Sequence, residues 1–281
     1  MSVRIITDST SDLTPEVRVR VGVIPLSIRF GEEEYIDGVT ITTDEFYRKL
    51  SGGSVLPTTS QATPASFEKL FRETVEAGDT AVVITIASGL SGTYQSGVIA
   101  AEDYPGKIFV VDSENVAIGA GILVEYALKL ADQGMEADRI AAELTKLRSK
   151  VYLVAVVDTL EYLRKGGRIG RVASMLGSVL NLKPIISCDA DGAYYVVSKA
   201  RGRVKSIAET VALALKQVQG NAKYCIAVAN GSAREEAAKL AQELRQRLPD
   251  AQLFLECEVS PALGVHTGPG LLGIGVQVGE G

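Results

Sequence analysis

Three short polar segments of this chain carry side chains that could hold an anion. One is ASGLSGTYQSG, in which Ser91, Gly92 and Thr93 stand between an apolar run and an expected helix. Small residues let the backbone approach a ligand closely, and a helix N-terminus offers free N–H groups. This combination suits a carboxylate or a phosphate, although ordinary helix capping uses the same residue types.

The other two segments supply hydroxyls and a titratable ring. PTTSQATP contains Thr59 and Ser60 between prolines, and GVHTGPG contains the only histidine, His266, followed by Thr267. Histidine is the side chain whose ordinary pKa permits a charge change near neutral pH. The surrounding glycines predict that His266 lies in a loop between two strands. Taken alone, each segment could be a polar loop without a ligand.

Basic side chains cluster around a Gly-Gly turn in LEYLRKGGRIGR. They are Arg164, Lys165, Arg168 and Arg171. In a chain with a net charge of −5, such a cluster could attract a phosphate or an acidic partner surface, or could simply be a solvated face.

Two further patterns are weaker. In TDSTSD, Asp8 could bind a metal or orient a hydroxyl, but a turn with a helix cap is the simpler interpretation, and we expect no metal site. GPGLLG matches G-x-G-x-x-G, yet it precedes a strand near the chain end, with no following helix and no acidic residue about 20 positions later. A P-loop is also absent from the sequence, so we expect no nucleotide cofactor.

Short apolar runs alternate with helical patterns in the first half of the chain. Strands are expected at 3–7, 23–30, 81–87 and 107–112, and helices at 42–50, 66–78, 91–101 and 117–148 with a break near Gly134. Buried strands that alternate with helices predict a parallel sheet covered on both faces.

The pattern changes at residue 151. Strands are expected at 151–158, 183–188, 193–200, 224–230, 251–259 and 271–278, and helices at 203–219 and 232–247. The turn DADGA indicates a hairpin. We predict an α/β protein of two domains: an N-terminal parallel α/β/α sheet domain over 1–150 and a C-terminal α/β domain with a mixed sheet over 151–281. The last strand could return to the first domain.

Composition excludes several classes of function. The chain has 281 residues, of which 46% are hydrophobic and 22% charged, which is typical of a globular protein. Its net negative charge argues against nucleic acid as the main partner. The three cysteines have no metal-binding spacing and indicate reduced thiols. With neither a signal peptide nor a transmembrane segment expected, we place the protein in the cytoplasm.

Five ordered blocks resemble the DegV family of bacterial fatty-acid-binding proteins. The blocks are TDSTSDL, PTTSQATP, LSGTYQSG, VVDTLEYLRKGGRIG with LNLKPII, and HTGPG, and together they span nearly the whole chain. Ala62 stands where the family often has proline, and Gly170 where serine or a similar small residue is usual. Neither departure touches the expected ligand contacts.

The resemblance implies a binding subunit without catalytic activity of its own. It would enclose a single long-chain fatty acid and present the carboxylate to a separate ATP-dependent fatty-acid kinase, whose acyl-phosphate product enters phospholipid synthesis. Carried over by motif, the carboxylate contacts would come from Thr59 or Ser60, Ser91 with Gly92 and Thr93, and His266 with Thr267. Arg168 or Arg171 would contact the kinase or the phosphate, and Arg164 remains an alternative. The fatty acid would be the ligand, and no cofactor is implied.

Two other functions are alternatives. A serine hydrolase acting on an acyl ester would need Ser91 as nucleophile and His266 as base, but Thr93 occupies the final glycine position of the G-x-S-x-G elbow. An autonomous small-molecule kinase would need a nucleotide motif, which the sequence lacks.

Overall fold

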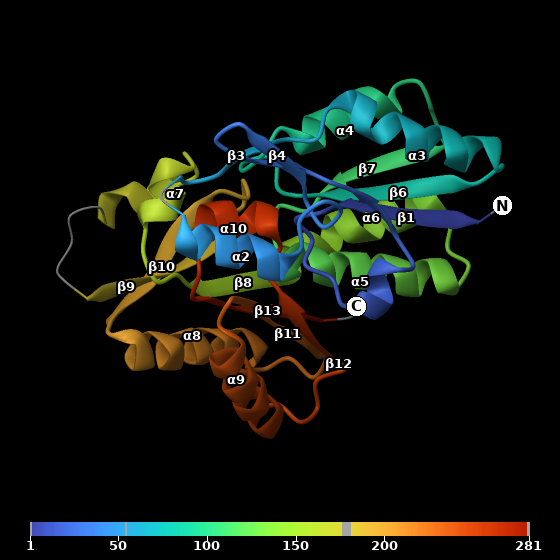
Figure 1. The fold of residues 1–281 in the computed structure, drawn as a ribbon. Coiled ribbons are helices and arrows are strands. Elements are labelled where there is room, and N and C mark those ends of the chain that lie inside the picture. Colours follow the sequence, from blue (N-terminus) through green and yellow to red (C-terminus); the bar gives the residue numbers. More distant parts are fainter. Residues whose placement is uncertain (1, 54, 176–180, 280–281) are drawn as a thin grey trace.

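The computed structural model describes residues 2–53, 55–175 and 181–279 (Figure 1). In its first half, parallel strands form a sheet in the spatial order β2 (Gly22–Ile24), β1 (Val3–Asp8), β6 (Thr80–Thr85) and β7 (Ile108–Asp112). Every residue of β6 is buried, because helices cover both faces of the sheet. The helices of this half are α1 (Pro15–Arg18), α2 (Thr43–Gly52), α3 (Pro64–Glu76), α4 (Thr93–Ala101), α5 (Ile118–Asp132) and α6 (Ala137–Leu147).

The second half forms a larger mixed sheet. Its spatial order is β10 (Tyr194–Arg201), β9 (Leu182–Cys188), β8 (Val151–Val156), β13 (Leu271–Val278), β11 (Tyr224–Gly231) and β12 (Leu253–Glu258). Only the β11–β12 pair is parallel within this described sheet. The helices are α7 (Glu161–Lys165), α8 (Arg203–Val218), α9 (Arg234–Arg247) and α10 (Pro261–Thr267), with 3-10 turns at Arg148–Lys150 and Gly170–Met175. The predicted α/β class, with one parallel and one mixed sheet, is confirmed.

The two sheets lie stacked with helices between and outside them (Figure 1). Helices α3 and α4 cover the outer face of the first sheet, and α8 packs on the outer face of the second. Helix α5 lies between the sheets and contacts β1 and β6 on one side and β8, β11 and β13 on the other. Its sequence, IGAGILVEYALKLAD, is apolar on nearly all sides, which suits a helix buried from both directions. One continuous hydrophobic core therefore joins the two halves.

A small antiparallel sheet was not predicted. Its spatial order is β4 (Glu33–Ile36), β3 (Ser27–Phe30) and β5 (Thr58–Ser60). The single strand expected at 23–30 is wrong, because the chain divides at Pro25 into β2 and β3, which belong to different sheets. Proline has no N–H to donate to a ladder, so a sheet pairing that runs through it is disfavoured.

His266 does not lie in a loop, as its glycine-rich surroundings predicted, but in the last turn of α10. Pro261 occupies the first turn, where its missing N–H costs nothing, and Gly268 ends the helix with φ at 70°. The apolar side of α10 packs with α2 and the small sheet, through Ala262 and Val265. A segment from the second half of the sequence is thus packed against elements of the first. None of the described helices combines the length and apolarity that a membrane span requires.

Candidate functional site

A polar cavity lies at the carboxyl ends of β1 and β6. These two strands are neighbours, but the chain leaves β1 toward β2 on one side and returns to β6 on the other. Such a reversal of strand order opens a crevice that commonly binds ligands in α/β sheets. The cavity has a volume of about 30 Å³. Its lining residues are Thr10, Leu26, Thr59, Gln61, Ile86, Leu90, Ser91, Arg168, Tyr194, Ala262, Leu263 and His266.

Thr59 and His266 meet in this cavity although 207 positions separate them. The Thr59 hydroxyl lies 2.8 Å from Nε2 of His266. Strand β5 brings Thr59 there through its pairing with β3, and α10 brings His266. Ser60, the other candidate of this segment, points away and is exposed, because successive residues of a strand face opposite sides. The structure therefore places Thr59, and not Ser60, at the cavity.

His266 is buried, with 8% of its surface exposed. Burial, together with the nearby positive charge of Arg168, lowers the pKa of His266 to about 4. The imidazole is therefore neutral at physiological pH. Its Nδ1 atom has no hydrogen-bond partner among the described residues, and a side chain at Gly166 would collide with that atom. The Gly-Gly turn of the basic segment thus allows the chain to pass close to the ring.

Ser91 lines the cavity, whereas its neighbours support the loop around it. The Ser91 hydroxyl lies 3.0 Å from that of Thr93, which is buried and accepts a hydrogen bond from the backbone N–H of Ala62 at 3.3 Å. A side chain at Gly92 would collide with Gln61. Thr93 and Gly92 therefore join the Ser91 loop to the segment that follows Thr59, and neither lines the cavity itself.

The basic residues are separated by the fold. Arg168 lines the cavity, where its guanidinium donates to the carbonyl oxygens of Leu90 at 3.2 Å and Gly166 at 3.0 Å. Arg171 instead forms ion pairs at 3.0 Å and 3.5 Å with the two aspartates of the DADGA turn, and Arg164 is exposed on α7. Of the candidate arginines, Arg168 is the one beside His266.

A second, apolar cavity of about 20 Å³ adjoins the first. Tyr194 and Leu263 line both cavities and separate them. Thr267 lies here, with its hydroxyl donated to the Leu263 carbonyl oxygen at 3.1 Å, and not at the polar cavity as expected. The remaining lining residues are Val116, Ala117, Ile118, Leu153, Ala155, Ile186, Ser187, Ala229, Val259, Leu271 and Gly273.

The floor of the apolar cavity is a row of small residues across the second sheet. Gly273 of β13 is paired with Ala155 of β8 on one side and Ala229 of β11 on the other. A Cβ atom at Gly273 would meet its nearest neighbours at 3.7–3.8 Å, so the glycine leaves usable space. Our sequence reasoning missed these residues, as it missed Tyr194 and Leu263. A glycine within the apolar strand LLGIGVQV was the available signal, because such glycines mark a close approach.

The hydrolase geometry is not formed by the residues described. Ser91 bonds to Thr93, while the Nε2 atom of His266 bonds to Thr59. A nucleophile and its base must share a hydrogen bond, and the base needs an acceptor to orient its other nitrogen. The partnerless Nδ1 of His266 does not meet that second requirement. Asp8 accepts hydrogen bonds from the backbone N–H groups of Thr10 and Ile86, so it shapes the edge of the cavity as a turn residue.

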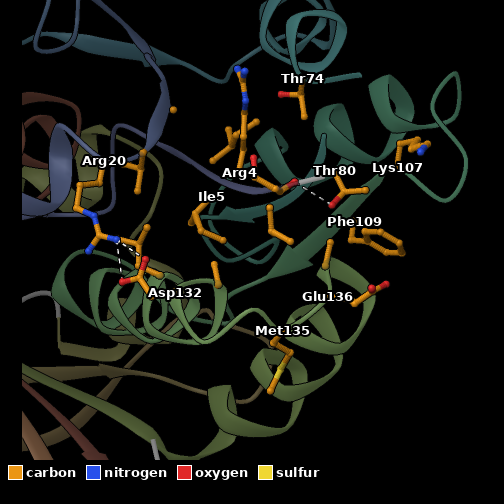
Figure 2. Close-up of a pocket in the computed structure, with 18 of the residues that line it drawn as sticks. Arg4, Ile5, Arg20, Thr74, Thr80, Lys107, Phe109, Asp132, Met135 and Glu136 are labelled. Carbon is orange, nitrogen blue, oxygen red and sulfur yellow. Dashed lines mark hydrogen bonds and ion pairs between the residues drawn. The ribbon is translucent and has the colours of Figure 1, made fainter. Parts of the chain in front are cut away.

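A much larger depression lies elsewhere, at the amino ends of β1 and β6 (Figure 2). Its volume is about 990 Å³. Some of its charged side chains form ion pairs: Arg20 contacts Asp132 at 2.7 Å, and Arg4 lies 3.5 Å from Asp79. It contains none of the residues expected to hold a ligand. Because ligands of α/β sheets bind at the carboxyl ends of the strands, we assign the site to the opposite edge.

Comparisons with known proteins agree with the sequence blocks. The model of the DegV family, described as a family of uncharacterised proteins, matches residues 2–278. A DegV domain-containing protein of Clostridium acetobutylicum is 37% identical over 276 residues, or 97% of either chain. The solved structure of a fatty-acid-binding DegV family protein from Thermus thermophilus has a TM-score of 0.92 and 33% identity, and the match covers 99% of this chain and 100% of that protein. A stearic-acid-binding protein from Eubacterium ventriosum has a TM-score of 0.88 and 30% identity, covering 99% and 98%.

Proposed function

Because this chain belongs to the DegV family, we propose that it binds a single long-chain fatty acid, with the carboxylate in the polar cavity and the acyl chain in the apolar one. One observation carries the proposal: a hydroxyl-lined cavity and an enclosed apolar cavity adjoin and share Tyr194 and Leu263 as their common wall. A molecule with a small polar head and a long apolar tail matches this pair. The similar structures whose descriptions mention fatty-acid binding support the same ligand class.

The carboxylate would be held mainly by neutral donors. An unpartnered carboxylate is very costly to bury, so several donors must converge on it. With Nε2 of His266 donating to Thr59, the hydroxyl hydrogen of Thr59 is free to point into the cavity. Ser91 offers a second hydroxyl, and Arg168 a positive charge whose Nε and Nη1 atoms are already engaged by carbonyl oxygens. Such a set leaves a carboxylate oxygen more reactive than a bidentate arginine clamp would.

The acyl chain would supply most of the affinity. Burial contributes about 0.8 kcal/mol per methylene, so a long chain gains on the order of 10 kcal/mol before ordering costs are subtracted. An acyl chain is larger than the two cavities as they stand, so Tyr194 and Leu263 must move aside when it binds. Binding is therefore coupled to a rearrangement of the wall between the cavities.

We further propose that the bound carboxylate is presented to a separate ATP-dependent kinase, which forms the acyl phosphate used in phospholipid synthesis. The family resemblance supports this role, and the placement of Arg168 beside the polar cavity suits a contact with the kinase or the transferred phosphate. The chain itself would then be a binding subunit and not an enzyme. A cytoplasmic location follows from the partner's need for ATP and is compatible with the three free thiols.

The test of ligand binding is the mass of whatever the protein carries. Protein purified from a bacterial host is examined by native mass spectrometry, and its organic extract by lipid mass spectrometry. We expect one long-chain fatty acid per chain. Absence of lipid, together with no uptake of added palmitate or oleate, would refute the proposal. Turnover of a p-nitrophenyl ester that disappears in Ser91→Ala would favour the hydrolase instead.

The kinase role has its own test. With a bacterial fatty-acid kinase and ATP, Arg168→Ala is expected to lower acyl-phosphate formation while fatty-acid binding persists. Arg171→Ala is the matched control, because Arg171 is engaged by the aspartates of the hairpin turn and lies away from the cavity. Equal activity of the Arg168 variant and the wild type would exclude the proposed role of Arg168.

A further inference from the structure

Helix α10, which carries His266, has no cap within its own segment. Ser260 occupies the N-cap position, but its side chain makes no capping hydrogen bond. The first N–H groups of any helix lack partners inside the helix and must find them elsewhere. Here they find them in the first half of the chain.

Two buried aspartates supply the missing acceptors. Asp12 accepts a hydrogen bond from the backbone N–H of Ser260 at 3.0 Å, and Asp37 accepts one from that of Ala262 at 3.4 Å. The aspartates are 4% and 1% exposed and belong to the loops that follow β1 and β4. They hold the start of α10 from positions 248 and 225 residues earlier in the sequence.

The position of α10 determines the geometry of both cavities. Its residue Leu263 stands in the wall between them, and His266 and Thr267 line the polar and the apolar cavity respectively. The bond of 2.8 Å between Thr59 and His266 joins this helix to β5, so even a small displacement of α10 would break it.

Burial raises the pKa values of both carboxyl groups. Loss of hydration raises the pKa of Asp37 to about 6 and raises the pKa of Asp12 well above its ordinary value, against the opposing effect of their hydrogen bonds. Burying a carboxyl group costs free energy, and the hydrogen bonds that its oxygens accept offset part of that cost. The titratable and charged groups that interact with one or the other of the two aspartates are Asp8, Arg18, Tyr47, Tyr194 and Cys257.

We propose that Asp12 and Asp37 are positioning residues for the fatty-acid site, which cap α10 from the other half of the chain and thereby set the place of His266. This inference depends on the proposed function only for the identity of the ligand. Neither aspartate lines the polar cavity, so their effect passes through the helix.

The single histidine makes a direct test possible. Protein labelled with ¹³C,¹⁵N-histidine gives one imidazole signal, whose titration reports the environment of His266 without any fatty acid. In the double variant Asp12→Ala, Asp37→Ala we expect the pKa of His266 to rise from about 4 toward its ordinary 6.5, because a displaced ring becomes hydrated. Palmitate affinity should fall about tenfold or more.

Asp12→Asn with Asp37→Asn is the conservative rescue, because an amide oxygen still accepts the backbone hydrogen bonds; the signal of His266 should return to its wild-type position. Leu244→Ala, which removes a buried side chain of α9, is the matched destabilised control and should leave the signal unchanged. If the double alanine variant does not fold, the same titration of His266 in the single variant Asp12→Ala tests the proposal. A wild-type His266 titration in a folded alanine variant would overturn the proposal, whether or not the protein binds fatty acid.

Discussion

The polar and the apolar cavity share a wall but are built in opposite ways. The polar cavity takes its side chains from separate segments: Thr59 from an edge strand, Ser91 from a loop, Arg168 from a turn and His266 from a short helix. The apolar cavity is built largely from the regular face of the second sheet, where Ala155, Gly273 and Ala229 lie side by side.

This difference separates two kinds of recognition. If the cavities hold a fatty acid as proposed, recognition of its head group depends on a few hydrogen bonds from segments that must be held in place, so it is sensitive to distant supports such as the cap of α10. Tail recognition depends on volume, which a sheet face defines by the size of the side chains that it presents. Substitutions at the two cavities should therefore weaken fatty-acid binding in different ways.

Filling the apolar cavity should have the largest effect. Gly273→Leu is expected to weaken binding of palmitate by about 1,000-fold, because excluding about five methylenes forfeits on the order of 4 kcal/mol. Shorter fatty acids should bind nearly as well as they bind to the wild type. Calorimetric titration with acids of increasing length measures both.

Gly273→Ala is the control for that substitution. Its Cβ would make ordinary contacts at 3.7–3.8 Å, so we expect only a small loss of palmitate affinity. Unchanged palmitate binding by a folded Gly273→Leu protein would show that the tail lies elsewhere.

The pH dependence of the free energy of unfolding should distinguish His266, which lines the polar cavity, from Asp37, which caps α10. Because the pKa of His266 is lowered to about 4, the folded protein loses stability as pH falls from 6.5 toward 4, when only the unfolded chain gains a proton. Because the pKa of Asp37 is raised to about 6, its contribution runs the other way and is lost as pH rises from 3.8 to 6.

Each contribution is on the order of 3 kcal/mol. Relative to the wild type, His266→Ala should gain stability as pH falls, and Asp37→Asn should gain it as pH rises. Urea unfolding at several pH values measures these differences. Differences from the wild type that stay constant with pH would contradict this account.

Removing one hydroxyl from the polar cavity should have a smaller effect. Thr59→Val keeps the shape of the side chain but removes its bond to His266, and we expect palmitate affinity to fall about tenfold. Binding of the matching fatty alcohol, which carries no charge, should fall less. Equal losses for acid and alcohol would contradict a carboxylate at this position.

The smallest effect is expected next to Thr59. Ser60→Ala changes an exposed hydroxyl on the opposite side of β5, so palmitate affinity should change less than about twofold. The same titration serves as the measurement. A loss comparable to that of Thr59→Val would mean that Ser60, and not Thr59, holds the head group.

Local pattern was enough for the elements of the two large sheets and for the residue types at the polar cavity. The mostly apolar run of β6 and the alternating helices predicted a parallel sheet, and the small hydroxyl residues after β6 predicted an anion site that includes Ser91. These features depend on hydrophobic period and turn chemistry, which short stretches of sequence contain. The glycines around His266 led to the wrong prediction of a loop. Packing of Ala262 and Val265 against the small sheet and α2 stabilises a helix there.

Only the tertiary structure decided which residues meet. Thr59 reaches His266, Arg168 and not Arg171 borders the cavity, and Asp12 and Asp37 cap a helix more than 200 positions away. The apolar cavity depends on the register that aligns Gly273 with two alanines. The sequence by itself predicted the elements of the two large sheets, because periodicity is local. Strand register and helix docking decided the site, because they follow from the packing of the whole core.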